Sequence, residues 1–258
     1  MRLAELFSVE GKVALVTGGT RGIGLMIARG FVENGVRTYI CSRKADACAA
    51  AVDEINAALG RRAAISIPAN IAAKEALQSL ADETRRAFGQ IDILVCNAAA
   101  NPYFGPMAGM SDDQFTKVLQ NNIVSNHWLI AMCAPEMRAR KDGAIIIVSS
   151  VGGLKGSPVI GAYNISKAAD MQLARNLAVE FGPDNVRVNT IAPGLVQTDF
   201  AKALWDNPQI LKTYTEQSCL KRIGQPDEIA GMAVFLASPA GAFTSGQTFI
   251  IDGGQTAI

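Results

Sequence analysis

The residues best suited to chemistry are a tyrosine and a lysine four positions apart, Tyr163 and Lys167. On a helix this spacing places both side chains on one face, one turn apart. An ammonium held near a phenol stabilises the phenolate, so we expect it to lower the pKa of Tyr163 from its ordinary value of about 10. Ser150 follows an apolar run, residues 144–148, that is typical of a buried strand. Its hydroxyl could hydrogen-bond a substrate oxygen that Tyr163 protonates as a general acid.

The elements that must position these side chains alternate between strand and helix. Ser111 and Gln114 form a capping box that begins one long helix, which carries Asn122 and which Pro135 is expected to kink near its end. The pattern predicts an α/β fold: a single doubly wound Rossmann-type domain over residues 1–258, with a parallel sheet of about seven strands flanked by helices. Strands are predicted at residues 12–17, 37–41, 63–68, 91–96, 144–148, 186–191 and 248–251, and the other helices at 25–34, 45–59, 74–88, 163–181 and from 226.

A glycine-rich turn joins the first strand to the first helix. Gly18 allows a tight turn, Gly22 allows close approach of the backbone to a pyrophosphate, and Gly24 allows close packing of helix on strand. The spacing, Gly-x-x-x-Gly-x-Gly, differs from the commoner Gly-x-Gly-x-x-Gly, and glycine-rich turns without a ligand are common. Its position in the first strand–helix unit favours a dinucleotide site.

The residues after the second strand indicate which dinucleotide binds. An acidic residue there would hold a ribose 2′-hydroxyl, whereas an arginine accommodates a 2′-phosphate. This chain has Ser42 and Arg43, followed by Lys44, and Arg21 of the glycine turn can converge on the same point. The alternative is a solvated basic strand end, but two separate segments supply the charge. The sequence therefore predicts NADP(H).

Together the ordered motifs resemble the short-chain dehydrogenase/reductase family over essentially the whole chain. The glycine turn looks like the family's coenzyme turn, and Asn97-Ala98-Ala99 stands where the family has Asn-Ala-Gly. The resemblance implies a catalytic tetrad of Asn122, Ser150, Tyr163 and Lys167, in which the asparagine braces its helix and relays Lys167 to solvent through water. Pro193-Gly194 and Thr198 match the nicotinamide-contacting Pro-Gly-x-x-x-Thr. The resemblance implies these cofactor-binding residues: Gly18, Thr20, Arg21, Gly22, Ile23, Gly24, Ser42, Arg43, Asn70, Ile71, Asn97, Ala98, Ala99, Tyr163, Lys167, Pro193, Gly194, Val196 and Thr198.

Two positions depart from the family pattern. Ala99 replaces the usual glycine, which slightly crowds the ribose floor. Asn70 stands where an aspartate usually contacts the adenine, and its amide could still serve.

The expected substrate pocket lies at the carboxyl ends of the strands. The turn-rich loop 101–106 is similar to that of a carbonyl-reductase branch that acts on ketones, dicarbonyls and retinoid-like aldehydes. The segment of about residues 195–220 is expected to fold over the substrate, and its aromatics favour an apolar ligand; Trp205 could equally be a core residue. The pocket is predicted to comprise Asn101, Tyr103, Phe104, Gly152, Leu154, Phe200, Leu204 and Trp205.

These assignments predict an NADP(H)-dependent oxidoreductase that reversibly reduces a ketone or aldehyde to an alcohol. Hydride passes to the carbonyl carbon, Tyr163 protonates the oxygen, Ser150 orients it, and Lys167 holds the nicotinamide ribose. One alternative is a 3-oxoacyl-carrier-protein reductase of fatty-acid synthesis. Another is a non-catalytic NADP-binding regulator, against which the complete tetrad argues. The first alternative needs a basic docking patch, for which the candidates are Arg138, Arg140, Lys141 and Arg175.

Composition excludes other classes of site. The 258 residues carry a net charge of +1, with the charged residues dispersed, so no basic stripe indicates nucleic acid. His127 is the only histidine and is interpreted as a helix residue, which argues against His-based triads and His-rich metal sites, and no metal is expected. The cysteines are scattered without a Cys-x-x-Cys pair, which favours buried thiols in a reducing compartment. They are Cys41, Cys48, Cys96, Cys133 and Cys219.

The sequence also indicates location and assembly. No apolar run approaches the roughly 18 residues that span a membrane. The N-terminus lacks the apolar core of a signal peptide, and residues 256–258 are not a peroxisomal address. We therefore expect a cytoplasmic protein without a membrane or nucleic-acid partner. The family resemblance implies a homotetramer, or at least a dimer, through the helices that carry Asn122 and Tyr163.

Overall fold

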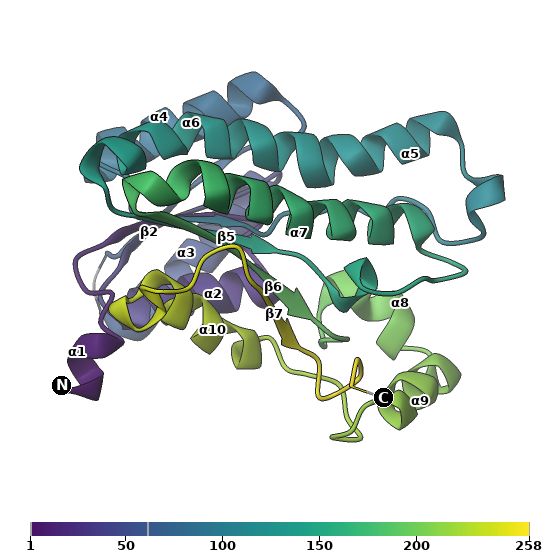
Figure 1. Ribbon diagram of the computed structural model, residues 1–258. Coiled ribbons are helices and arrows are strands. Elements are labelled where there is room, and N and C mark those ends of the chain that lie inside the picture. The colour runs from purple at the N-terminus through teal and green to yellow at the C-terminus, as the bar shows by residue number, and fades with distance from the viewer. Residues whose placement is uncertain (1, 61, 258) are drawn as a thin grey trace.

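The computed structural model, which describes residues 2–60 and 62–257, is built around a parallel sheet of seven strands (Figure 1). The strand order is β3-β2-β1-β4-β5-β6-β7, and every neighbouring pair is parallel. This confirms the predicted single α/β domain. The strands are β1 (Val13–Thr17), β2 (Arg37–Ser42), β3 (Ala64–Pro68), β4 (Ile93–Cys96), β5 (Gly143–Val148), β6 (Val186–Pro193) and β7 (Thr248–Ile251).

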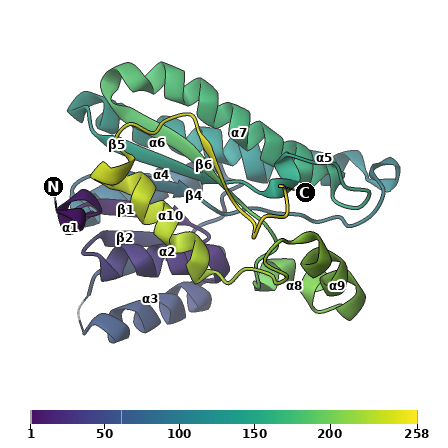
Figure 2. The same cartoon turned by 60° about the horizontal axis from the view of Figure 1, so that its bottom comes forward.

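Helices cover both faces of the sheet (Figures 1 and 2). Helices α2, α3 and α10 pack on one face, and α4, α6 and α7 pack on the other. The helices are α1 (Leu3–Leu6), α2 (Gly22–Glu33), α3 (Ala45–Leu59), α4 (Lys74–Phe88), α5 (Asp112–Leu119), α6 (Ser125–Arg140), α7 (Gly161–Phe181), α8 (Lys202–Trp205), α9 (Pro208–Gln217) and α10 (Asp227–Ala237). Among the described residues, no helix is both long and apolar enough to cross a membrane.

The two cores follow from the apolar strands. Side chains alternate across a strand, so a strand that is buried on both faces must be apolar throughout. In β1, Ala14 and Val16 pack into the core under α2 and α10, whereas Leu15 packs into the core under α4, α6 and α7. All five residues of β1 and all six of β5 are buried. The central strands are therefore held rigidly, and their carboxyl ends make a fixed platform.

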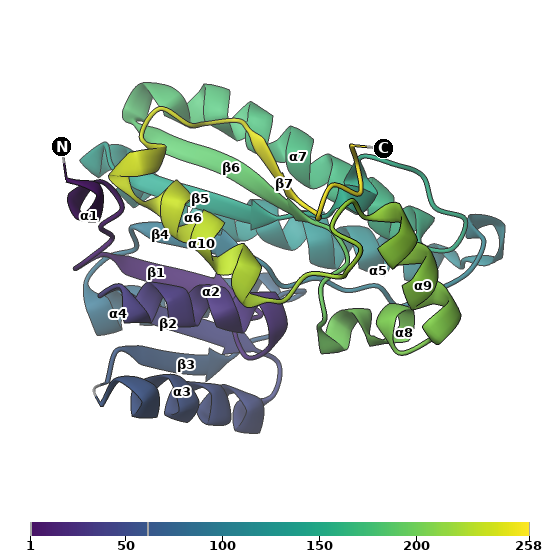
Figure 3. The same cartoon turned by 90° about the horizontal axis from the view of Figure 1, so that it is seen from below.

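The strand order reverses between β1 and β4, and the candidate site lies at this reversal. In open α/β sheets, ligands bind outside the carboxyl ends of strands at such a point. The glycine turn follows β1, Asn97 follows β4, and Ser150 closely follows β5. Helices α8 and α9 lie beyond the same ends of the strands (Figure 3). The sheet thus gathers segments from distant parts of the chain.

Two local features differ from expectation. Helix α2 begins at Gly22, three residues earlier than predicted, so Gly22 and Gly24 lie within its first turn. The predicted long helix does begin with the Ser111 capping box, but a π-helical turn, Gln120–Val124, separates α5 from α6. Helix α6 then continues through Pro135 to Arg140. The irregular turn therefore lies around Asn122, well before the proline.

Candidate active site

Ser150 is positioned by the end of β5. Its hydroxyl accepts a hydrogen bond of 3.1 Å from the amide of Gly152, which fixes the start of the following 3₁₀ turn. The hydroxyl of its neighbour, Ser149, donates to the carbonyl oxygen of Lys167 at 2.7 Å. That bond ties the end of β5 directly to α7. Ser150 and the face of α7 that carries Tyr163 are thus held together by buried backbone.

Tyr163 and Lys167 rise from one face of α7, as their spacing predicted. The Nζ atom of Lys167 lies 5.7 Å from the centroid of the Tyr163 ring. The Lys167 side chain is only 2% exposed. Its ammonium donates to the carbonyl oxygen of Val148 at 2.8 Å and to Oδ2 of Asp170 at 2.9 Å. A buried, fully oriented ammonium therefore stands beside the phenol.

The predicted lowering of the Tyr163 pKa is wrong for the protein alone. Burial raises the pKa of Tyr163, because the apolar surroundings disfavour the phenolate, and the negative charge of Asp170 raises it further. Lys167 and the hydroxyl of Ser150 both act in the opposite, expected direction, but they do not outweigh burial. Burial also lowers the pKa of Lys167, but Asp170 and Tyr163 more than offset this, so its pKa is raised and it stays charged.

Asn122 braces the site from the opposite side. It is fully buried in the π-helical turn. Its Oδ1 accepts from the amide of Ala100 at 2.8 Å, and its Nδ2 donates to the carbonyl of Ala100 at 3.1 Å and to the hydroxyl of Ser166 at 2.9 Å. These bonds join the loop after β4 to α7. The side chain thus sets the distance between the loop after β4 and α7.

The glycine turn has the features that a dinucleotide needs. Gly18 and Gly22 have positive φ angles of 65° and 54°, and residues other than glycine adopt such angles only with backbone strain. A Cβ at Gly18 would lie 2.9 Å from Nδ2 of Asn97. Arg21, the residue that precedes α2, makes no side-chain hydrogen bond to cap that helix. The first amides of α2 are therefore not capped by the Arg21 side chain, and the residues present fit a pyrophosphate.

The candidate 2′-phosphate residues come from two segments that meet. The amide of Gly19 donates to the carbonyl of Cys41 at 3.2 Å, which brings the glycine turn against the end of β2. Arg43 is exposed there, and Ser42 contacts the thiol of Cys48 at 3.4 Å. The Nη1 atom of Arg21 lies 3.7 Å from Oδ2 of Asp199, and the Arg21 side chain is 64% exposed. Arg21 thus lies near the end of β2, as predicted, but its guanidinium also forms an ion pair with Asp199.

Other predicted cofactor residues lie around the same edge. Asn97 donates from Nδ2 to the carbonyls of Thr17 and Gly18, so it fixes the turn. Thr198 packs its methyl group against Gly22. Val196 is buried in the core beneath α10, which leaves only its backbone for a ligand. Asn70 receives a hydrogen bond from the amide of Ala72.

The aromatic residues of the predicted pocket divide into two groups. The ring of Phe200 lies 5.9 Å from the ring of Tyr163, centroid to centroid, and half of its surface is exposed. In contrast, the indole of Trp205 donates to the carbonyl of Thr198, and the hydroxyl of Tyr103 donates to the carbonyl of Pro106, each within its own segment. Phe200 is therefore placed beside Tyr163, whereas the polar atoms of Trp205 and Tyr103 hold their own segments.

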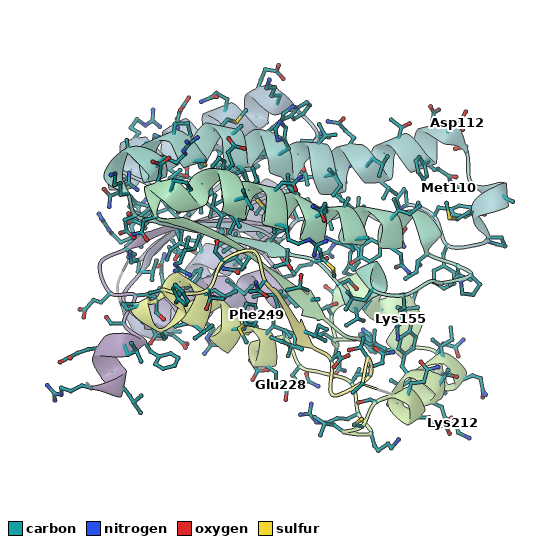
Figure 4. The ribbon with its side chains drawn as sticks, in the orientation of Figure 1. Met110, Asp112, Lys155, Lys212, Glu228 and Phe249 are labelled. Atoms are coloured by element: carbon teal, nitrogen blue, oxygen red, sulfur yellow. The ribbon has the colours of Figure 1, made fainter. Side chains whose placement is uncertain are left out.

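Loop 101–106 is tied to the segment that precedes α7. The amide of Gly105 donates to the carbonyl of Val159 at 2.8 Å. Phe104 and Leu154 remain about half exposed. Figure 4 shows Lys155 at the same end of the molecule as Lys212 of α9 and Asp112 of α5. Both loops thus present exposed apolar side chains.

Three buried polar residues near the site were missed from the sequence. Asp170 is fully buried beside Lys167, and its Oδ1 accepts from Nδ2 of Asn126 at 3.0 Å. Asn164 donates from Nδ2 to the carbonyl of Lys155 at 3.0 Å and so holds the loop after Ser150. Their signal was present in the sequence, since all three stand one helical turn or less from a tetrad residue.

Two of the four residues of the candidate carrier-protein patch, Arg138 and Arg140, are paired with carboxylates of this chain. Arg138 forms ion pairs with Asp184 and Glu180, and Arg140 forms ion pairs with Glu136 and Asp92. Arg175 is hydrogen-bonded to a glutamine of its own helix. Within residues 2–60 and 62–257, no group of three or more acidic, histidine or cysteine side chains is placed to hold a metal ion.

Comparison with known proteins identifies the family to which the chain belongs. A family model described as enoyl-(acyl carrier protein) reductase matches residues 18–256. The chain is 37% identical to dehydrogenase/reductase SDR family member 4 of Sus scrofa over 249 residues, which cover 95% of this chain and 88% of the relative. The chain belongs to the short-chain dehydrogenase/reductase family. It is an oxidoreductase of the CH–OH/C=O class.

Solved structures of the short-chain dehydrogenase/reductase family share the fold over the full length. A gluconate 5-dehydrogenase from Burkholderia cenocepacia, in complex with NADP and tartrate, is similar with a TM-score of 0.94 and 30% identity over all of both chains. A 7α-hydroxysteroid dehydrogenase, complexed with NADH and 7-oxo glycochenodeoxycholic acid, is similar with a TM-score of 0.93 and 35% identity over 98% of both. The fold therefore accompanies either nicotinamide cofactor and very different substrates.

Proposed function

We propose that this enzyme is an NADP(H)-dependent carbonyl reductase that converts a small apolar ketone or aldehyde into an alcohol, reversibly. The observation that carries the proposal is the convergence of the Ser150 hydroxyl, the Tyr163 phenol and the buried Lys167 ammonium at the carboxyl end of β5. A hydrogen-bond donor, an acid and a fixed positive charge around one point are what proton transfer to a carbonyl oxygen requires.

Each of the four tetrad residues has a distinct part in the proposed reaction. Ser150 orients the substrate oxygen, and Tyr163 gives that oxygen its proton. Lys167 stabilises the phenolate that remains, and the third hydrogen of its ammonium is available to a cofactor ribose because the protein uses two. Asn122 fixes the spacing of these parts. The bound nicotinamide supplies the hydride, and in the reverse direction the phenolate takes the alcohol's proton.

The preference for NADP(H) rests on the residues at the end of β2. Ser42 replaces an acidic residue that would repel a 2′-phosphate, and Arg43 is exposed next to it. Arg21 approaches from the glycine turn, although Asp199 shares its charge. Charge-assisted hydrogen bonds from arginine to phosphate are among the strong ones in proteins. Both segments therefore support the phosphorylated cofactor.

The preference for an apolar substrate rests on Phe200, whose ring lies beside that of Tyr163, and on exposed hydrophobic side chains of the loops after β4 and β5. Phe104, Leu154 and Phe200 are 53%, 48% and 50% exposed. Large apolar side chains near a catalytic group stabilise apolar ligands by removing their surface from water. The carrier-protein alternative lacks comparable support, because Arg138 and Arg140 already pair with carboxylates of this chain.

Assembly and location follow the same proposal. We expect a homotetramer, or at least a dimer, through the outer faces of α6 and α7, where Val179 is 80% exposed. The five free cysteines support a reducing compartment, and we propose the cytoplasm.

A substrate panel tests the proposed function. Ketones, aldehydes and acyl thioesters are offered with NADPH or NADH, and cofactor absorbance is followed. We expect apolar ketones or aldehydes to be reduced with NADPH far faster than with NADH, and faster than acyl thioesters. A protein that binds NADPH but turns over none of the three classes would instead be the non-catalytic regulator. Preferential reduction of acyl thioesters would favour the carrier-protein alternative.

A further inference from the structure

A buried carboxylate, Asp170, lies next to the catalytic lysine and has no part in the mechanism described above. It stands three residues after Lys167 on α7 and is fully buried. Its Oδ2 receives a hydrogen bond of 2.9 Å from the ammonium of Lys167, and its Oδ1 receives one of 3.0 Å from Nδ2 of Asn126 on α6. Both carboxylate oxygens are thus engaged by named donors.

Both donors to this carboxylate are themselves held by further hydrogen bonds. Asn126 also donates to the carbonyl of Asn122 at 2.7 Å, so the amide that holds Asp170 is itself anchored to the π-helical turn. The ammonium of Lys167 has three hydrogens. Val148 and Asp170 accept two of them, so one remains for the reaction side. Asp170 therefore determines in which direction the free hydrogen points.

We propose that Asp170 is a positioning residue for catalysis: it orients the Lys167 ammonium and places a buried carboxylate beside the lysine–tyrosine pair. Burial raises the pKa of Asp170, whereas the charge and hydrogen bond of Lys167 and the hydrogen bond of Asn126 oppose this and favour the carboxylate. The inference rests on the proposed function of Tyr163 as the acid. With lysine alone, loss of the phenol proton would leave a neutral pair of phenolate and ammonium. With Asp170 present, the same loss leaves a net negative charge in a buried site, which costs more free energy.

The charged and titratable groups that face this cluster are few. On α7 they are Tyr163, Lys167 and Asp170, and from β4 the thiol of Cys96 faces the pair. Burial raises the pKa of Cys96 well above its ordinary value, so this thiol stays neutral. From the segment after β5 the neutral Ser150 faces the phenol, and from α6 the neutral Asn126 faces the carboxylate. Asp170 is thus the negative charge of the cluster before Tyr163 ionises.

The consequence for the reaction is a bias toward the acid role. Reduction of a carbonyl needs Tyr163 with its proton, whereas oxidation of an alcohol needs it without. By raising the pKa of Tyr163, Asp170 extends the pH range over which reduction proceeds and moves oxidation to higher pH. The cluster therefore favours the reducing direction near neutral pH.

Titration of the tyrosine in the protein without cofactor tests this directly. The ultraviolet absorbance of tyrosinate is followed with pH, and the curve of Tyr163→Phe is subtracted to isolate Tyr163. The same difference is measured in the Asp170→Asn background. A unit charge at roughly 10 Å, with an effective dielectric constant of about 20, shifts a pKa by about one unit. We expect the midpoint of Tyr163 to fall by about that much in Asp170→Asn.

A matched control separates charge from packing. Asn126→Leu removes a hydrogen bond that favours the charged form of the same carboxylate, but it leaves the charge and hydrogen bond of Lys167, which act on Asp170 more strongly. The carboxylate should therefore stay charged, and the Tyr163 midpoint should stay close to that of the wild type. An unchanged or higher midpoint in Asp170→Asn would overturn the proposal. An equal shift in Asn126→Leu would also overturn it, since packing alone would then account for the effect. Neither measurement depends on turnover, so both stand apart from a failure of the proposed function.

A stability comparison at neutral pH covers the case in which Asp170→Asn folds poorly. Lys167→Met leaves the Asp170 carboxylate buried without its counter-charge, which destabilises a protein strongly. If Lys167 and Asp170 are a buried ion pair, the double variant Lys167→Met with Asp170→Asn should melt at a higher temperature than Lys167→Met alone. A double variant that melts no higher would show that Lys167 and Asp170 are not an interacting pair, and the proposal would fall.

Discussion

Replacement of Asn122 by leucine removes the hydrogen bonds that join the loop after β4 to α7, while it keeps the branching and the number of side-chain heavy atoms. Three hydrogen bonds are lost, two to the backbone of Ala100 and one to the hydroxyl of Ser166. Ser166 is fully buried, but its hydroxyl still donates to the carbonyl of Tyr163 at 2.7 Å. The greatest loss is therefore at Ala100, whose amide and carbonyl both lose their partner.

The expected magnitude follows from these contacts. A typical hydrogen bond contributes about 0.5–1.5 kcal/mol net, and a buried group left without a partner costs about 1–3 kcal/mol. Ala100 is half-buried, so water can partly replace Asn122 there. We expect Asn122→Leu to lower the free energy of unfolding by about 2–4 kcal/mol, which combines these terms. Binding of NADPH should also weaken, because Ala100 follows directly after the predicted ribose floor.

The neighbouring residue offers a matched control. Asn121 makes one described side-chain hydrogen bond, from Nδ2 to the carbonyl of Lys117 at 2.7 Å, within its own helix. Asn121→Leu should therefore cost less than about 1 kcal/mol, since a single bond is lost and leucine favours helix. Both variants are unfolded in urea at equal subunit concentration. Midpoints that imply free energies within about 0.5 kcal/mol of each other would refute the bracing role.

Three further predictions concern the cofactor, the thiols and the assembly. We expect kcat/KM to favour NADPH over NADH by at least about a hundredfold, since two phosphate contacts of about 1.5 kcal/mol each correspond to that ratio. Ser42→Asp with Arg43→Ile should reverse this preference, and equal use of both cofactors by the wild type would contradict it. A thiol reagent should label Cys219 alone in the native protein, because Cys219 is exposed and the other four cysteines are buried. Burial also raises the pKa of Cys41 and Cys133 to about 12, so these two thiols stay protonated. A second cysteine that reacts rapidly would contradict this prediction. Light scattering should report a tetramer or dimer, and a monomer at micromolar concentration would remove the assembly proposal.

Much of the fold could be predicted because its signals are local. The apolar runs that form β1 and β5 are each a continuous stretch of sequence, and so is the glycine turn. The sheet buries both strands, as their apolar composition indicates. The spacing of Tyr163 and Lys167 likewise needed only the geometry of a helix. Features of this kind depend on neighbours in the chain.

The remaining features depend on contacts between distant segments. The raised pKa of Tyr163 results from burial and from Asp170, whose carboxylate is held by a residue of another helix, Asn126. The ion pair of Arg21 with Asp199 joins the glycine turn to the segment before α8. The π-helical turn at Asn122 has no sequence signature comparable to a capping box. Periodicity and motif spacing carry no information on such pairings, which only packing determines.

The central claim is that Tyr163 is the proton donor to the carbonyl, and Tyr163→Phe tests it most directly. The substitution removes only the hydroxyl, so the folded variant should bind NADPH nearly as tightly as the wild type. Positioned acids contribute about 10²–10⁴-fold to rate, so kcat/KM for carbonyl reduction should fall by at least about a hundredfold. A folded Tyr163→Phe enzyme that retains most of the wild-type rate would contradict the account.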